Sequence, residues 1–292
     1  MHETVATVVE NRELGSGVWL LRLRSSAVCS DHEPGRFVML GTGEEVAGGP
    51  PSPLLRRPFS IQRVQGDVFE VLYRVVGVGT RCMSELRPTL RVPVLGPLGN
   101  AFTLPQPGER AVLLGGGVGI PPMVALADRL SALGHGEWRA YLGVSSAADS
   151  GCFVGFEERY GAELSDGRAL RATMDGSVGF AGNVIEAWLR DRASGIPQGG
   201  ERVYACGPMP MLRAVARTCA ELDVPAEVSV ETMMGCGVGI CMGCVIENRT
   251  YADGTAAQRA CMSPYDRWLM ACTKGPVFGA QSVVLDDGGL LH

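Results

Sequence analysis

The sequence has no long basic run and a modest excess of acidic residues. It contains 26 Lys and Arg residues against 31 Asp and Glu residues, a formal net charge of -5. A protein that binds nucleic acid through the phosphate backbone needs a concentrated positive surface, which this composition does not provide. We therefore expect no nucleic-acid partner.

Long uninterrupted apolar runs are also missing. The most apolar stretch, AVLLGGGVGIPPMVALA, is broken by glycine and proline, and the start MHETVATVVENRELGSG lacks a basic region followed by an apolar one. A membrane helix needs about 20 consecutive apolar residues, and a secretory signal needs the pattern that is missing here. The sequence predicts a cytoplasmic protein without a membrane span.

Histidine is scarce, and the commonest hydrolase signature is absent. The four histidines lie singly in termini or turns, and no serine stands in a G-x-S-x-G frame. A histidine-dependent metal site and the nucleophile of an α/β-hydrolase therefore have little support. Cysteine, by contrast, is abundant.

Ten cysteines occur in a chain of 292 residues. Without an export signal, they favour metal ligation or redox chemistry over a disulfide scaffold. The stretch GCGVGICMGC contains Cys236, Cys241 and Cys244, and Cys272 follows after 27 intervening residues. This C-x4-C-x2-C spacing with a distant fourth cysteine is typical of plant-type [2Fe-2S] centres.

Two alternatives remain open at the cysteines. A zinc ribbon usually pairs two C-x2-C knuckles, and only one such pair is present, so zinc is the weaker interpretation. Cys261 could replace Cys272 as the fourth ligand, although the Gly-Pro turn after Cys272 favours the latter. The interleaved glycines suit a loop that turns N-H groups towards sulfur, because glycine tolerates positive φ angles and close approach. They are Gly235, Gly237, Gly239 and Gly243.

Strand and helix patterns divide the chain into three parts. The first hundred residues read as closely spaced strands without helical periodicity, which indicates a sandwich or a small barrel. After LPQPGER, short apolar strands alternate with helices, as in a doubly wound parallel sheet. From about residue 232 the Cys/Gly-rich segment is too poor in apolar runs for a conventional core, so something other than burial must hold it together.

Three motifs suit nucleotides. LLGGGVGIPPM follows a predicted strand and opens a helix with Pro121 and Pro122, so a diphosphate could bind the free N-H groups there, although an ordinary strand-to-helix turn can look similar. LLRRPFSIQRV and YRVVGVGT offer an arginine and a second glycine pocket in the other part of the chain. In RVYACGPMPML, Cys206 ends a strand and either packs internally or contacts a reactive ring.

Taken in order, EPGRFVML, RRPFSI, YRVVGVGT, LGPLGN, GGGVGIPP and ACGPMPML resemble the ferredoxin-NADP reductase superfamily along nearly the whole chain. The appended MMGCGVGICMGCVI and CTKGPVF are similar to one branch, the electron-transfer subunits of two-subunit, NAD-linked dihydroorotate dehydrogenases. The resemblance implies a multi-domain fold. An antiparallel β-barrel (1–104) would bind FAD, a doubly wound parallel α/β sheet (105–228) would bind NAD, and a small C-terminal domain (229–292) would hold a [2Fe-2S] cluster.

The same resemblance implies site residues. FAD would be held by Arg57, Pro58, Phe59, Ser60, Tyr73, Arg74, Val75, Gly79 and Thr80. NAD would be held by Gly115, Gly116, Gly117, Gly119, Thr173, Asp175, Cys206, Gly207 and Pro208, with Cys206 as the catalytic residue beside the nicotinamide. The cluster ligands would be Cys236, Cys241, Cys244 and Cys272.

The expected activity follows from what each cofactor carries. A nicotinamide exchanges two electrons at once and an iron-sulfur cluster one, so a flavin must stand between them. The resemblance implies a heterotetramer in pyrimidine biosynthesis, in which a flavin-containing catalytic subunit oxidises dihydroorotate and this chain, lacking an orotate site, passes the electrons to NAD. Rivals are a reductase subunit of a glutamate synthase-like, sulfide or hydrogenase complex, an oxygenase reductase, and a non-enzymatic zinc module. YLGVSSAADS has no arginine for a 2'-phosphate, which favours NAD over NADP.

Overall fold

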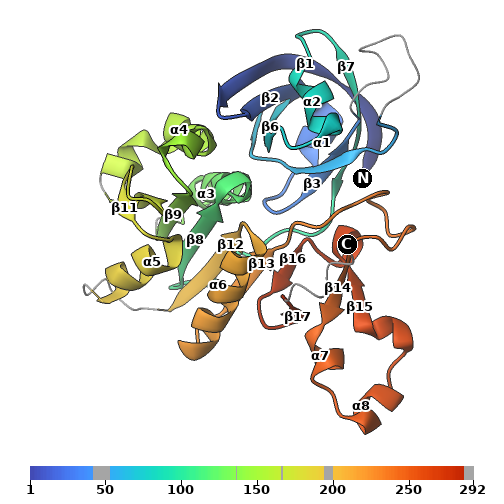
Figure 1. Ribbon diagram of the computed structural model, residues 1–292, viewed down its shortest axis with the longest axis vertical. Helices are drawn as coiled ribbons and strands as arrows, with labels where there is room; N and C mark the ends of the chain where they lie inside the picture. The colour runs from blue at the N-terminus through green and yellow to red at the C-terminus, as the bar shows by residue number, and fades with distance from the viewer. Residues whose placement is uncertain (42–52, 136, 166, 194–199, 286–292) are drawn as a thin grey trace.

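The computed structural model describes residues 1–41, 53–135, 137–165, 167–193 and 200–285, and the strands of this described part form three sheets (Figure 1). The first two sheets have seven strands each and the last has three. The first sheet is made of strands from the first hundred residues, whereas the second sheet takes one strand, Val277–Gly279, from between two strands of the third.

The first sheet is antiparallel throughout. Its strands, in spatial order, are β4 (Arg57–Ser60), β3 (Phe37–Leu40), β7 (Arg91–Leu98), β1 (His2–Gly15), β2 (Val18–Arg24), β6 (Val68–Arg74) and β5 (Arg63–Gln65). The sheet curves into a half-barrel around Leu21, Phe69 and Tyr73, all buried (Figure 1). Two short helices, α1 (Ser26–Ser30) and α2 (Val78–Ser84), accompany it.

The second sheet is parallel except at one edge. In spatial order its strands are β11 (Phe180–Ala181), β10 (Ala169–Thr173), β9 (Trp138–Val144), β8 (Arg110–Gly116), β12 (Glu201–Cys206), β13 (Ala226–Ser229) and β16 (Val277–Gly279). Only the last pair, β13 with β16, is antiparallel among these described strands. Near-continuous apolar runs such as VLL in β8 fit strands that are buried on both faces.

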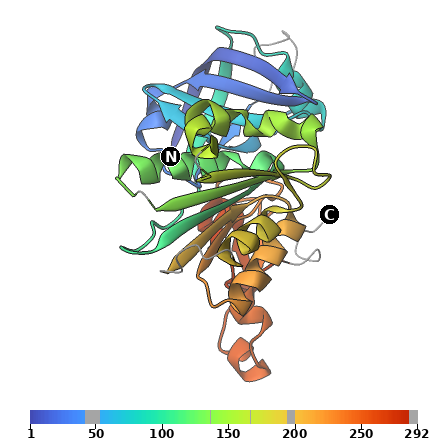
Figure 2. The ribbon, with the colours of Figure 1, turned by 90° about the vertical axis from the view of Figure 1, so that its left-hand side faces the viewer.

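Helices cover both faces of this second sheet (Figure 2). They are α3 (Pro121–Ala132), α4 (Val154–Ser165), α5 (Val184–Ala193) and α6 (Met209–Glu221), with 3-10 turns η1 (Gly117–Gly119) and η2 (Ala147–Phe153). On one face, α3 and α4 pack around Trp138 and Phe156. On the other, α5 and α6 pack around Trp188 and Leu212. The alternation of strands and helices predicted from the sequence is confirmed.

The two ends of helix α3 are marked in the sequence by residues that favour the start and the end of a helix. Pro121 and Pro122 occupy its first two positions, where a missing N-H group costs no hydrogen bond. After its last residue the chain reaches Gly134 with φ +71°, and the N-H of Gly134 bonds to the carbonyl of Ser131 at 3.1 Å. Only glycine adopts this conformation without strain, which explains why the helix ends here.

The third sheet consists of β15 (Trp268–Met270), β14 (Val245–Asn248) and β17 (Val283–Val284). The elements around it are α7 (Arg249–Ala252), α8 (Ala256–Ala260), η3 (Pro264–Arg267) and α9 (Ala271–Lys274). Cys244 and Cys272 belong to the same buried cluster as Trp188 and Leu212, so the small sheet shares a core with the second sheet. Strand β16 was not expected from the sequence, since it leaves the C-terminal part and joins β13.

Candidate functional site

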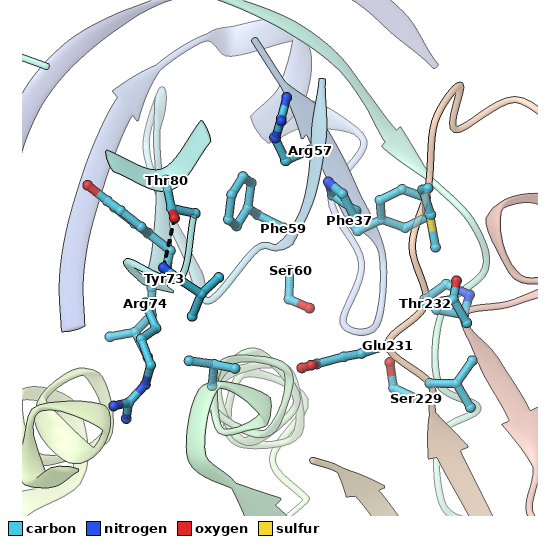
Figure 3. Close-up of a pocket in the computed structure, with 17 residues that line it drawn as sticks. Phe37, Arg57, Phe59, Ser60, Tyr73, Arg74, Thr80, Ser229, Glu231 and Thr232 are labelled. Atoms are coloured by element: carbon cyan, nitrogen blue, oxygen red, sulfur yellow. Dashed lines mark hydrogen bonds between the residues drawn. The ribbon is translucent and has the colours of Figure 1, made fainter. Parts of the chain in front are cut away.

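A cavity of about 410 Å³ opens between the first and second sheets (Figure 3). Strand β4 contributes four consecutive residues to its wall, and β6 contributes its last three. The opposite wall comes from the segment that follows β13. The lining residues are Phe37, Arg57, Pro58, Phe59, Ser60, Leu72, Tyr73, Arg74, Val76, Thr80, Val118, Ser229, Val230, Glu231, Thr232, Met234 and Pro276. Seven of the nine residues predicted for FAD therefore line one cavity.

Arg57 and Gly79 fit one another at this cavity. A Cβ atom at Gly79 would overlap the guanidinium group of Arg57, so only glycine leaves room for that side chain. The guanidinium also donates to the carbonyl of Leu55. Gly79 is thus a spacer rather than part of the wall, and Val75, whose N-H bonds to the carbonyl of Gly17 at 2.8 Å, is not among the lining residues either.

Thr80 organises the glycine turn that enters α2. Its hydroxyl accepts a hydrogen bond from the N-H group of Val76 at 2.9 Å (Figure 3) and another from the N-H group of Gly77 at 3.2 Å. These bonds hold the turn in place at the start of a helix, where N-H groups are available for an anion. The Thr80 side chain therefore fixes the glycine turn, and contact of this turn with a diphosphate stays a prediction.

A buried hydroxyl without a partner lines the same cavity. The Oγ1 atom of Thr232 is buried and makes no hydrogen bond within the described part of the chain. Burying a polar atom without a partner is costly, so a ligand atom that bonds to it would relieve the cost. Together with Phe59, Tyr73 and the arginine, this arrangement fits a planar, phosphorylated group such as FAD.

Glu231 lines the first cavity, and Cys206 lies close enough to be affected by its charge. The carboxyl group of Glu231 projects into the cavity (Figure 3), and desolvation by the surrounding protein raises its pKa. Cys206 is buried, and burial followed by the nearby Glu231 raises the pKa of its thiol well above the ordinary value. Cys206 is therefore a protonated thiol, and it lines neither this cavity nor the next one.

A second cavity, of about 210 Å³, lies at the carboxyl ends of β8, β9 and β12. Ligands of doubly wound sheets bind at this edge. The lining residues are Arg74, Gly116, Gly117, Gly143, Val144, Ser145, Asp149, Met174, Gly182, Asn183, Val184, Pro208 and Met211. Of the residues predicted for NAD, the wall contains Gly116, Gly117 and Pro208.

The other predicted dinucleotide residues support the cavity from behind. A Cβ atom at Gly119 would lie 2.5 Å from the carbonyl of Cys206, so this glycine allows η1 to pack against the end of β12. Gly115 pairs with Cys206 across the strands. Thr173 is buried, and its hydroxyl donates to the carbonyl of Val178 at 2.9 Å.

Two further predicted residues also stand away from the wall. The carboxylate of Asp175 accepts from the hydroxyl of Ser177 at 2.6 Å, which stabilises the turn after β10. Gly207 lies against Gly116 and Met211, where a Cβ would be 2.9 Å from the sulfur of Met211. Neither residue is among those that line the cavity.

The structure brings the four predicted cluster ligands together in two pairs. The thiol of Cys236 interacts with that of Cys241, and the thiol of Cys272 interacts with that of Cys244. Each iron of a [2Fe-2S] cluster takes two protein ligands, which matches this pairing. Within the described residues, no three His, Cys, Asp or Glu side chains are arranged around one single-ion position. Cys261 is exposed and is the C-cap residue of α8.

Backbone N-H groups surround the sulfur atoms. The Sγ atom of Cys236 accepts from the N-H groups of Val238 and Cys241, both at 3.4 Å. Burial alone would raise the pKa of Cys236, but the N-H groups of Cys241 and Val238 lower it to about 6. Burial and the neighbouring Cys244 raise the pKa of Cys272 to about 12. Metal binding would displace the proton from Cys272.

The glycines of the loop serve two different purposes. Gly237 and Gly239 have φ angles of +75° and +83°, as the sequence predicted. A Cβ at Gly237 would also lie 2.7 Å from Met39 of β3, so the cysteine loop packs closely on the first sheet. Gly235 and Gly243 do not have positive φ, and a Cβ atom at either position would lie at ordinary contact distance, 3.6 Å, from the sulfur of Cys241.

Several wall residues were not predicted from the sequence. Glu231, Thr232 and Met234 line the first cavity, and Asp149 and Asn183 line the second. A signal existed for Glu231, because residues after a strand of a parallel sheet lie at its ligand-binding edge. Asn183 precedes α5, and its side chain accepts from the N-H groups of Ile185 and Glu186, which is a helix-start signal.

In the described residues, no helix combines the length and the apolar character needed to cross a membrane.

The second sheet and the cysteine segment each match a known family. The profile of the oxidoreductase NAD-binding domain matches residues 113–217. The profile of the iron-sulfur cluster binding domain of dihydroorotate dehydrogenase B matches residues 231–284.

Relatives match over almost the whole chain. The electron transfer subunit of dihydroorotate dehydrogenase B (NAD(+)) from Geobacillus sp. (strain WCH70) is 36% identical over 289 residues, covering 98% of this chain and 100% of that protein. The subunit of the same name from Bacillus pumilus (strain SAFR-032) is 34% identical, covering 98% and 99%. Among solved structures, an NADH-dependent reduced ferredoxin-NADP oxidoreductase superimposes with a TM-score of 0.76 at 23% identity, covering 98% of this chain and 93% of its own.

The structural likeness shows a ferredoxin-NADP reductase-like fold, and the sequence identity over the full length goes further. The likeness covers the first two sheets and the segment that carries the four cysteines, since the match spans 98% of the chain. This chain belongs to the family of the electron transfer subunits of dihydroorotate dehydrogenase B (NAD(+)).

Proposed function

We propose that this chain is an oxidoreductase subunit that takes electrons from the catalytic subunit of a dihydroorotate dehydrogenase and delivers them to NAD+, in pyrimidine biosynthesis. Family membership supports this function over the other reductase complexes considered above. When bound, FAD and a [2Fe-2S] cluster would supply the exchange between two-electron and one-electron chemistry. The residues of this chain would hold each of those groups at its own site.

One observation carries the proposal in structural terms. The segment after β13 first forms a wall of the flavin cavity, through Glu231, Thr232 and Met234, and then supplies the first cluster ligand, Cys236. FAD and the cluster, which would exchange single electrons, would therefore both be held by this one continuous segment. A reductase that only exchanged electrons between FAD and NAD would have no use for this connection.

The residues have distinct roles in this proposal. Arg57 and the turn held by Thr80 would bind the FAD phosphates, and Thr232 would donate to or accept from the ring edge. The glycine turn at Gly116 and Gly117 would bind the dinucleotide. Cys206, as a neutral thiol behind both cavities, would position Glu231 and the turn at Gly119. Cys236, Cys241, Cys244 and Cys272 would hold the cluster.

The domain organisation follows the same division. We propose an FAD-binding barrel over 1–104, a doubly wound NAD domain over 105–228 and a cluster domain over 229–292. The first sheet supports the barrel as a half-barrel of antiparallel strands, and the second supports the doubly wound domain. β16 pairs with β13, so the cluster domain is attached to the NAD sheet by an edge strand.

The surface of the cysteine loop suits a partner. Cys241 is exposed, and the neighbouring Ile240 exposes 82% of its surface. Met242 and Met233 are exposed as well. An apolar patch beside a redox centre is typical of an interaction site. The catalytic subunit is the occupant that the family name implies for this patch.

The purified, cofactor-loaded chain tests the division of labour. Alone, it should oxidise NADH with an artificial electron acceptor and should not oxidise dihydroorotate, because the proposal assigns the two cavities described above to FAD and NAD and places the orotate site on the catalytic subunit. Adding a flavin-containing dihydroorotate dehydrogenase catalytic subunit should produce dihydroorotate-dependent reduction of NAD+. Dihydroorotate oxidation by the chain alone, or no response to the catalytic subunit, would contradict the proposal.

A further inference from the structure

One side chain lies between the two cavities. Arg74, the last residue of β6, lines both of them. Its guanidinium group turns out of the flavin cavity (Figure 3), and Nη2 lies 2.8 Å from Oδ1 of Asp149 in η2. The flavin domain thus places a cation in the dinucleotide cavity, where a carboxylate of the NAD domain already holds it.

The charge balance of the second cavity depends on this pair. Among the described residues that line it, Arg74 and Asp149 are the only charged ones. The remainder are glycines, apolar residues, Ser145 and Asn183, and the side-chain oxygen of Asn183 already accepts two N-H groups of α5. A pyridine dinucleotide brings a diphosphate with two negative charges to a cavity whose single positive charge is neutralised.

We infer that Asp149 competes with the diphosphate of the dinucleotide for Arg74, so that the ion pair opens when the dinucleotide binds and closes again when it leaves. This inference rests on the proposed function, because it assumes that the second cavity takes NAD. A diphosphate offers a guanidinium group a stronger, bidentate set of acceptors than one carboxylate oxygen, so the exchange is favourable. Asp149 then limits the affinity and speeds the departure of the reduced dinucleotide.

The surroundings of Asp149 allow this exchange without unfolding. The 3-10 turn η2 is capped by Ser146, whose Oγ accepts from the N-H of Ala148 at 3.3 Å. The N-H of Ala147 donates to Oγ of Ser177 at 2.8 Å. Both contacts hold the turn independently of Arg74. The side chain of Asp149 retains 19% of its exposure and that of Arg74 32%, so water can solvate the carboxylate when the pair opens.

The experiment measures binding by calorimetry on the FAD- and cluster-loaded chain. The ligands are NAD+, NADH, ADP-ribose as a diphosphate without nicotinamide, and adenosine as a probe without phosphate. Asp149→Asn should lower the Kd for the three diphosphate ligands by about fivefold and leave that for adenosine unchanged. Arg74→Met should raise the same Kd values by about tenfold.

The double variant separates competition from simple repulsion. If Asp149 acts by occupying Arg74, then Asp149→Asn should give no gain in affinity in the Arg74→Met background. A full fivefold gain in that background would overturn the competition. Bound FAD is measured by absorbance in each variant, and Arg74→Lys, which keeps the charge, should bind ADP-ribose more tightly than Arg74→Met.

Glu158→Gln is the matched control. Glu158 of α4 makes ion pairs with Arg12 at 3.1 Å and Arg22 at 3.4 Å between the same two parts of the chain, but it does not line either cavity. Its loss should leave dinucleotide binding unchanged. Unchanged or weaker binding in Asp149→Asn, with normal binding by the unmodified chain, would overturn this inference alone. Failure of the unmodified chain to bind any dinucleotide would instead contradict the proposed function.

Discussion

At the residue scale, the fourth cluster ligand depends on position in space rather than on spacing alone. Cys272 is buried beside Cys244, whereas Cys261 caps α8 and is exposed. A thiolate ligand must approach its iron directly, and only Cys272 lies with the other three. The open question from the sequence, Cys261 or Cys272, therefore has a geometric preference.

Replacement of each cysteine tests this preference. Cys272→Ser should abolish or strongly perturb the EPR signal of the reduced [2Fe-2S] cluster, because it removes a thiolate from one iron. Cys261→Ser is the matched control and should leave the signal intact. The opposite pattern would mean that the chain around α8 rearranges to supply the ligand.

A second residue-scale prediction concerns FAD. Arg57→Ala removes the cation packed on Gly79 and should weaken FAD binding by about tenfold or more, since charge-assisted bonds to phosphate are lost. The neighbouring Arg56, which instead pairs with Glu3 at 2.7 Å, provides the control as Arg56→Ala. Absorbance of bound flavin after gel filtration measures the effect. Stoichiometric FAD in Arg57→Ala, with a normal circular dichroism spectrum, would remove Arg57 from the site.

The sequence predicted the local part of the site and missed the part made by distant segments. The cysteines and the stretch from Arg57 to Ser60 were readable because their spacing is short and chemically specific. Thr232 and Asp149 were not, because nothing near them in the sequence says that they face β4 or Arg74. Thr173 is not among the residues that line the second cavity, and its hydroxyl bonds to Val178 within its own turn.

At the element scale, the glycine turn η1 is constrained because the end of strand β12 packs directly against it. The turn joins β8 to α3 and touches the end of β12 at Gly119. The neighbours of Gly119 are backbone atoms of Cys206 and Gly207, which cannot move aside as a flexible side chain could.

Gly119→Ala should therefore be costly. The added methyl group overpacks a backbone contact, so we expect a loss of about 1–3 kcal/mol of unfolding free energy and weaker dinucleotide binding. Gly161→Ala in α4 is the control, because a Cβ there meets no atom within 4 Å, and its stability should not fall. Thermal melting of both variants measures the difference, and equal melting temperatures would show that η1 can shift.

The spacing of apolar residues predicted the alternating strands and helices of the second sheet. It did not predict elements whose own sequence carries a weak helix or strand pattern. The pattern of β8, α3, β9, α5, β12 and α6 was predicted because apolar spacing and turn residues agreed. Helix α4 was missed: its sequence VGFEERYGAELS contains two glycines, and Tyr160 within it has non-helical angles of φ -127° and ψ 34°. Strand β16 has three residues and exists through its pairing with β13, which no local pattern reveals.

At the scale of the whole molecule, the exposed apolar side chains beside the cysteines define a testable interface. Ile240→Glu places a charge in the patch and should weaken binding to the catalytic subunit by about tenfold or more, because a charge must be desolvated there. The EPR spectrum checks that the cluster remains. Surface plasmon resonance against the catalytic subunit measures the affinity.

Tyr265→Glu is the control for that prediction. Tyr265 is 76% exposed in η3, which contacts β14 and α7 of the same C-terminal part of the chain. The same charge at this position should leave the affinity for the catalytic subunit unchanged. Equal affinities for all three proteins would place the interface elsewhere.

The segment that carries the cysteines begins at β13 and ends at β16, and these two strands lie side by side. The N-H of Val230 bonds to the carbonyl of Pro276 at 2.9 Å, so the two ends of the segment are hydrogen-bonded to each other at the edge of the second sheet. Electron tunnelling depends steeply on distance. Met234 in the flavin wall and the ligand Cys236 are two residues apart, at most about 7 Å between their Cα atoms. FAD in the first cavity and a cluster on Cys236 would therefore be held near one another by a covalent link of two residues, whereas the distance to a partner protein would vary with docking.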